Sequence, residues 1–160
     1  ESYVAFPMNI IINTIPKKAK LQIRPPEDDI VNYGKYLVTI AGCKDCPTPF
    51  DKGQYDMTKT LAGGRVFSLP WGTVTSTNLT PDVETGIGSW SKDSFSSLFK
   101  AYVDRDDKPL HKPVGSNEFN TLMPWSFFGG MKVKDLNSIY EYLHTLDPVK
   151  NKVTKFVPKG

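Results

Sequence analysis

The two cysteines of the 160-residue chain, Cys43 and Cys46, are separated by two residues in the stretch AGCKDCPTPFD. A pair with this spacing is typical of covalent haem attachment, of a redox disulfide or of half a zinc site. Haem attachment also requires a histidine directly after the second cysteine, because that imidazole becomes the proximal iron ligand. Here the next residue is Pro47, whose side chain has no donor atom.

The surroundings of the pair separate these chemistries. A structural zinc site needs four ligands, and only His111 and His144 remain to supply them, at irregular spacing, so zinc is not expected. A thioredoxin-like pair follows a strand and opens a helix, whereas here a predicted helix precedes the pair and a loop follows. A structural disulfide stays open in an oxidising compartment. Haem attachment fits the order of helix, thiols and loop.

Composition limits the other possibilities. The length suits one domain, and the apolar and charged fractions are ordinary for a globular protein. A net charge of +3, spread along the chain, is not typical of a nucleic-acid binder. No apolar run is long enough to span a membrane, and the residues after Glu1 do not resemble a signal peptide. We therefore expect either a cytoplasmic protein or one whose export signal has been removed.

Hydrophobic periodicity predicts three helices and long loops between them. Residues 1–28 form an irregular arm with four prolines, in which Ile10–Ile12 are expected to pack on the core as a short strand or overlay. A first helix should begin near Asp29 and end at Gly42, just before the cysteines. Residues 47–88 are predicted to be loop, and so long a loop suggests that it wraps a cofactor.

The second half supplies the other two helices. Ser91 is the expected N-cap of a helix from Lys92 to about Val103. The last helix should run from about Lys134 to Leu146, before a basic tail at residues 149–160. Gly34 of the first helix should lie close to the last helix, where the two cross. The apolar face of this last helix consists of residues at helical spacing: Leu136, Ile139, Tyr140 and Leu143.

Met123 lies in an apolar, aromatic segment, TLMPWSFFGGM, that follows a polar loop. A methionine in such a segment is ordinarily core filler. Held by Pro124 and surrounded by aromatic residues, its thioether also has the setting of a soft axial ligand to haem iron, which raises the reduction potential.

Three segments in this order carry a resemblance: YGKYLVTIAGCKDC, TNLTPDVETGIGSWSKDSF and LMPWSFFGGMKVKDLNSIYEYLHTLDPVKN. They resemble the single-haem class I c-type cytochromes, and more narrowly the bacterial domains that accept electrons from membrane-bound dehydrogenases or respiratory chains. The resemblance implies an all-α class I cytochrome c fold over residues 29–148, with long loops and an irregular N-terminal arm.

The resemblance also implies one haem c, bound by thioethers at Cys43 and Cys46, with Met123 as the distal iron ligand. It implies electron transfer rather than enzyme activity, with a dehydrogenase or oxidase complex as redox partner. Because thioethers form after export, it implies a periplasmic location or the outer face of the cytoplasmic membrane. Asn78, Trp90 and Trp125 are the candidates near the haem propionates. The candidates for the apolar pocket are Leu69, Ile87, Phe95, Phe99, Leu122, Phe127 and Met131.

Pro47 is where this sequence departs from the family, whose attachment enzymes also recognise the missing histidine. Four explanations remain open. Residue 47 is a substitution or misreading of a true histidine, or haem is attached with an open proximal side. Alternatively, another histidine replaces the ligand, or no haem is bound. His144 is expected at the rim of the last helix, facing solvent, and His111 in a polar loop. An open iron would bind small ligands or peroxide. Without haem, the domain would serve as a docking subunit, with the cysteines as thiols or a disulfide.

Overall fold

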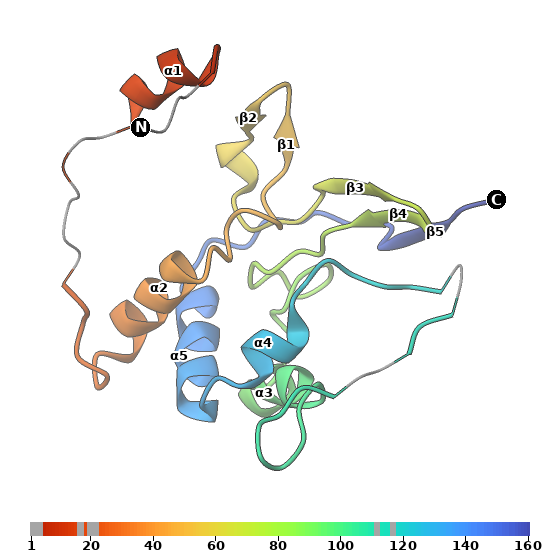
Figure 1. Ribbon diagram of the computed structural model, residues 1–160. Helices are drawn as coiled ribbons and strands as arrows, with labels where there is room; N and C mark the ends of the chain where they lie inside the picture. The colour runs from red at the N-terminus through yellow and green to blue at the C-terminus, as the bar shows by residue number, and fades with distance from the viewer. Residues whose placement is uncertain (1–4, 16–17, 19–22, 111–112, 116–117) are drawn as a thin grey trace.

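The computed structural model describes residues 5–15, 18, 23–110, 113–115 and 118–160. Short helices and strands alternate along the chain, and three helices gather into one body (Figure 1). The helices are α1 (Met8–Ile11), η1 (Ile12–Thr14), α2 (Ile30–Ile40), η2 (Met57–Lys59), α3 (Lys92–Lys100), α4 (Trp125–Gly129) and α5 (Val133–His144). The strands are β1 (Phe50–Asp51), β2 (Gln54–Tyr55), β3 (Val66–Leu69), β4 (Gly72–Thr75) and β5 (Phe156–Pro158).

Helices α2 and α5 lie side by side and form the centre of the body, as predicted (Figure 1). The Asp29 side chain caps α2 by accepting a hydrogen bond from the backbone N–H of Asn32. The helices touch at Gly34, where an added Cβ would lie 1.9 Å from the backbone oxygen of Ser138. Only glycine allows this close approach, so the expected contact is confirmed.

Helix α3 packs on the other side of α5, and α4 packs against α3. Ser91 caps α3 by accepting a hydrogen bond from the N–H of Ser94, as expected. Gly129 brings α4 close to α3, since its Cβ would lie 2.8 Å from the Phe99 carbonyl oxygen. The resulting core is one cluster of Tyr33, Leu37, Val38, Leu61, Ile87, Phe95, Phe99, Leu136, Ile139, Tyr142 and Leu143.

Two antiparallel sheets show that the all-α prediction was wrong. Strands β1 and β2 form a small hairpin, and β3, β4 and β5 form a three-stranded sheet in that order. Four strands lie within residues 47–88, which were predicted to be loop. β4 also pairs with the C-terminal tail, where Thr73 is opposite Val157. Glycine and proline at the turns concealed strands that are only two to four residues long.

The N-terminal arm also differs from expectation. Ile10, Ile11 and Ile12 lie in α1 and η1 and are about half exposed, so the prediction that they pack on the core was wrong. In the described part of the chain, α1 contacts η1 and no further element. None of the described helices is long and apolar enough to cross a bilayer.

Candidate functional site

The cysteine loop is presented by the end of α2. After Ala41, Gly42 takes a positive φ of 65°, its N–H donates to Thr39, and the N–H of Cys43 donates to Val38. This is the Schellman arrangement that commonly ends helices, and glycine favours it because the backbone is left-handed there. It places Cys43 half-buried against the core, with Cys46 exposed further along the loop. Both thiols are free rather than joined in a disulfide.

The two thiols are unequal because only one is buried. Burial, and then the neighbouring Cys46, raise the pKa of the Cys43 thiol from 9.0 to about 11. At neutral pH it is therefore a protonated thiol and a weak nucleophile.

In the haem-free chain, alkylation by iodoacetamide should distinguish the two cysteines. At about pH 8, roughly 0.1% of Cys43 is thiolate, so we expect Cys46 to react at least ~10-fold faster. The rate at Cys43 should rise about tenfold per pH unit until its pKa, near 11, is reached. Mass spectrometry of the alkylated peptides measures both rates, with the urea-unfolded chain as control. Equal rates in the folded chain would contradict the burial of Cys43.

Pro47 is buried and its backbone is used by the fold. Its carbonyl oxygen accepts a hydrogen bond of 2.6 Å from the N–H of Gly63, and the next residue, Thr48, accepts one from Leu61 at 3.1 Å. Gly63 has a φ of 77°, and its Cβ would lie 2.6 Å from the backbone of Thr77. The loop is therefore fixed against the segment before β3, but residue 47 offers no atom to a metal.

Arg65 also holds the loop in place. Its guanidinium lies over the rings of Phe50, Tyr55 and Phe67, 5.1 to 5.8 Å from their centroids. It donates a 2.7 Å hydrogen bond to the carbonyl oxygen of Asp45, between the two cysteines. The cation–π contacts anchor the loop to the β1–β2 hairpin and to β3.

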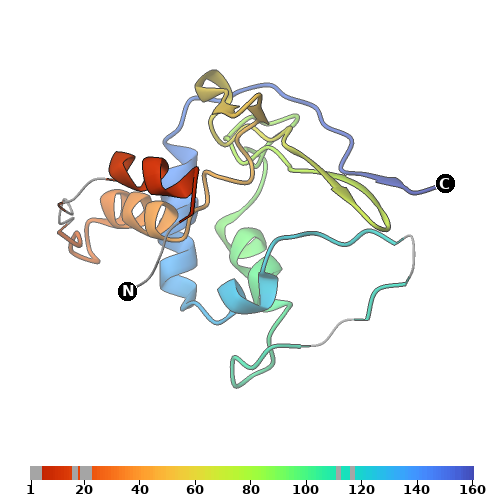
Figure 2. The same cartoon turned by 45° about the horizontal axis from the view of Figure 1, so that its top comes forward.

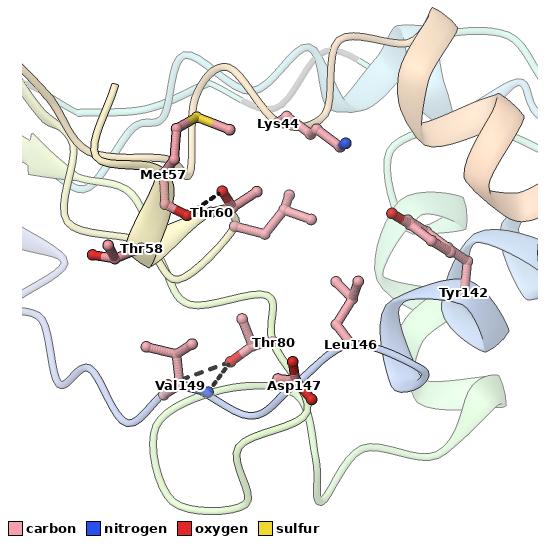
Figure 3. Close-up of a pocket in the computed structure, with 10 residues that line it drawn as sticks. Lys44, Met57, Thr58, Thr60, Thr80, Tyr142, Leu146, Asp147 and Val149 are labelled. Carbon is pink, nitrogen blue, oxygen red and sulfur yellow. Dashed lines mark hydrogen bonds between the residues drawn. The ribbon is translucent and has the colours of Figure 1, made fainter. Parts of the chain in front are cut away.

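A cavity of about 360 Å³ opens between the cysteine loop and the end of α5. Lys44 from the cysteine loop and Tyr142 from α5 line it, and Met57 and Leu146 add apolar wall (Figure 3). Burial raises the pKa of Tyr142, so its hydroxyl stays protonated. Over the residues that the structure describes, no three His, Cys, Asp or Glu side chains gather as a metal site.

The methionine segment packs on the same core as the cysteine loop. Met123 and Cys43 both lie against the core cluster, although they are far apart in sequence. The indole of Trp125 stacks on Tyr102, with centroids 5.2 Å apart, and packs against Phe99 at 5.3 Å. Its Nε1 is buried with no hydrogen-bond partner in the described part of the protein. A buried N–H without a partner is costly, which makes this atom a candidate donor to a bound group.

The other predicted pocket residues differ in their burial. Ile87, Phe95 and Phe99 are buried in the core cluster, and Met131 packs against it. Leu69 is half-buried in β3 and is not part of the core cluster. Exposure is greatest for Leu122, at 50%, and Phe127, at 76%, which the structure does not bring into the core.

The propionate candidates also differ from one another. Asn78 is buried, but its amide donates to Thr85 and to the Val149 carbonyl, so neither amide hydrogen is left for a carboxylate. Trp90 is exposed, and its carbonyl accepts a hydrogen bond from Tyr140. Of the three candidates, Trp125 has a buried donor available.

Sequence reasoning missed one comparable donor and misplaced one histidine. The Nε1 of Trp71, in the turn between β3 and β4, is also buried without a partner among the residues described. Nothing in the local pattern LPWG indicates that burial. His144 was expected to face solvent, but its ring lies 4.1 Å from that of Tyr140 and its Nε2 is buried. His111 falls outside the described residues.

These observations test whether the chain fits a haem c. Two free thiols, the Met123 thioether on the same core and the unpartnered N–H of Trp125 are donors of the right kinds for thioethers, an axial ligand and a propionate contact. Pro47 does not fit, since it supplies no proximal ligand. The residues therefore fit covalent attachment and distal ligation but leave the proximal side without a ligand from residue 47.

Comparison with known proteins also supports a haem c domain. The gluconate 2-dehydrogenase cytochrome c subunit of Pantoea cypripedii is 31% identical over 123 residues, which cover 76% of this chain and 24% of that protein. This chain is homologous to cytochrome c subunits of dehydrogenases. The fructose dehydrogenase cytochrome subunit of Gluconobacter japonicus is 30% identical over 115 residues, 72% of this chain and 21% of that protein.

A third relative is the cytochrome c subunit of the quinone alcohol dehydrogenase of Gluconobacter oxydans (strain 621H). It is 26% identical over 124 residues, 77% of this chain and 23% of that protein. The chain therefore spans between 21% and 24% of the length of these curated relatives. No family model matches the chain.

Proposed function

We propose that this chain carries one haem c, bound through Cys43 and Cys46, and transfers single electrons as part of a dehydrogenase. The observation that carries the proposal is that Cys43 and Met123 both pack against one core cluster in a chain homologous to cytochrome c subunits. When bound, the haem supplies the one-electron chemistry. The chain is then a carrier rather than an enzyme, and its redox partner is the dehydrogenase or an oxidase complex.

The chain's own residues set access and potential. Met123 offers a soft ligand, which favours the reduced iron. Trp125, stacked on Tyr102 and packed at a tilt against Phe99, would help to exclude water from the methionine side. Trp125 would donate its N–H to a propionate of the bound haem, which would remove the cost of leaving this donor unpaired.

We assign the haem domain to residues 29–148, with residues 1–28 as an arm and 149–160 as a tail. Because thioether attachment follows export in c-type cytochromes, we place the chain in the periplasm or on the outer face of the cytoplasmic membrane. The Asp29 cap supports the start of the domain, since it begins the helix that delivers the thiols through the turn at Gly42.

Removing Met123 tests the proposal. In chain produced with a haem-attachment system, Met123→Ala should lower the midpoint potential by on the order of 0.1 V, because the thioether ligand is lost. Potentiometric titration followed by visible absorption measures the potential. The matched control is Met8→Ala in α1, whose potential should equal that of the wild type; an unchanged potential in Met123→Ala would remove Met123 as a ligand.

Pro47 favours a second candidate function. A chain without its proximal ligand could remain haem-free and serve as a docking subunit of the dehydrogenase. The two functions differ in a simple readout, because the docking subunit is colourless and still co-purifies with its partner.

A further inference from the structure

The N-terminal arm carries a cluster of exposed apolar side chains that the electron-transfer function does not use. We define the apolar arm as Phe6, Met8, Ile10, Ile11, Ile12 and Ile15. Phe6 is 75% exposed, and the other five range from 47% to 60%. Helix α1 and η1 contact each other and no other element in the described ranges of the chain. This is a contiguous unpartnered apolar surface of the kind that marks an interaction site.

Between Glu1 and Glu27 every charged residue is basic. Residues 2–26 contain no aspartate or glutamate, whereas Lys17, Lys18, Lys20 and Arg24 follow the apolar residues. Lys18 is exposed. An apolar segment followed directly by basic residues is complementary to a surface that is apolar beneath and negatively charged on top.

Two polar side chains within the arm already have partners. Asn13 donates from its amide to the Asn9 carbonyl at 3.0 Å, and the Thr14 hydroxyl donates to the Ile11 carbonyl at 2.7 Å. Polar groups that are bonded within the segment cost less to take out of water. The arm can thus enter a less polar environment without leaving these donors unpaired.

The arrangement of the isoleucines distinguishes a lipid from a protein groove. Three consecutive residues, Ile10, Ile11 and Ile12, point in different directions around the helical turn, since successive residues differ by about 100°. A protein groove accepts one face of a helix, whose contacts recur at every third or fourth residue. The boundary between headgroups and acyl chains has no fixed groove, so it can receive apolar side chains from more than one face of a short segment.

The arm is tethered to the body at one defined place. Arg24 lies over the ring of Tyr33, 5.2 Å from its centroid, and Glu27 pairs with both Arg24 and Lys134. These contacts fix residues 24–27 against α2 and α5. In both views the arm lies on the α2 side of the molecule, away from the sheet of β3, β4 and β5 (Figures 1 and 2).

We propose that the apolar arm inserts into the headgroup region of an anionic lipid bilayer and holds the domain at the membrane surface. It lies in the interface rather than spanning it, because the segment is far shorter than the bilayer. The apolar side chains provide the insertion and Lys18, with the lysines beside it in sequence, provides the attraction to lipid phosphates. This inference does not depend on whether haem is bound.

Vesicle sedimentation tests the proposal with the full chain. Wild-type protein should pellet with vesicles of mixed phosphatidylglycerol and phosphatidylcholine, and at least ~10-fold less with phosphatidylcholine alone. Ile10→Asp should weaken binding to the anionic vesicles by at least ~10-fold. The control is Ile40→Asp on α2, because Ile40 is 62% exposed against 59% for Ile10. Ile40→Asp should bind as the wild type does.

The alternatives give different results. If wild type does not bind anionic vesicles, or if Ile10→Asp and Ile40→Asp bind equally, the proposal is wrong. If Ile10→Asp instead abolishes co-purification with the dehydrogenase while vesicle binding is absent, the arm is a protein contact and the lipid proposal is overturned. Circular dichroism of both variants should match the wild type, since each changed side chain is exposed.

Discussion

Pro47→His, produced with a haem-attachment system, is expected to change the iron from an open to a closed coordination state. The imidazole would occupy the position after the second cysteine and supply the missing proximal ligand. With Met123 on the other side, no position is left for exogenous ligands. We expect cyanide affinity to fall by on the order of 10- to 100-fold relative to wild type, and the yield of attached haem to rise.

The substitution is compatible with the local backbone. Residue 47 uses its carbonyl oxygen, which accepts from Gly63, and histidine keeps that oxygen. The matched control is Pro49→His, a proline two residues later whose carbonyl oxygen likewise accepts a backbone hydrogen bond, from Asp56. Absorption spectra with and without cyanide should be unchanged by Pro49→His. If Pro47→His also leaves cyanide binding unchanged, the proximal side is not open at residue 47.

Gly34→Ala should strongly destabilise the fold. Its Cβ would lie 1.9 Å from the Ser138 oxygen and 3.0 Å from the Tyr142 Cβ, so α2 and α5 must separate. Overpacking of this kind costs about 3 kcal/mol, and the Tm should fall by roughly 10 °C. Urea unfolding followed by circular dichroism measures the free energy of unfolding.

Gly130→Ala is the control for this loss. Gly130 has a φ of −71° at the end of α4, and the nearest atom to its added Cβ is the Phe127 oxygen at 3.5 Å. The same chemical change should therefore alter the free energy of unfolding by less than about 1 kcal/mol. Equal losses of unfolding free energy in the two variants would mean that the close α2–α5 contact at Gly34 is not what destabilises Gly34→Ala.

The three longer helices, α2, α3 and α5, were predictable because their signals are local. The spacing of Leu37 and Val38, the Ser91 cap and the stop at Gly42 each depend on neighbours within a turn or two. The strands were missed for the opposite reason. β3 and β4 are four residues each around Pro70, and β5 forms only through pairing with β4, far away in sequence. Periodicity over so few residues cannot distinguish a strand from a loop.

The candidate site likewise contains features with local signals and features that depend on distant contacts. The cysteine loop lies where the sequence predicts it, at the end of a helix, because Gly42 determines that turn locally. The burial of the Trp71 and Trp125 indoles depends on packing between distant segments, and no local pattern distinguishes them from exposed Trp90. The arm isoleucines were expected in the core because hydrophobicity alone does not say which apolar residues have a partner.

The central claim is that haem is covalently attached to Cys43 and Cys46. The most direct test is the intact mass of the protein purified from cells that express a haem-attachment system, with a peptide map across residues 36–52. We predict a mass raised by one haem, with the adduct on both cysteines and proline at position 47. A mass equal to the chain alone, or lower by two hydrogens from a Cys43–Cys46 disulfide, would contradict the claim and leave the haem-free docking subunit in its place.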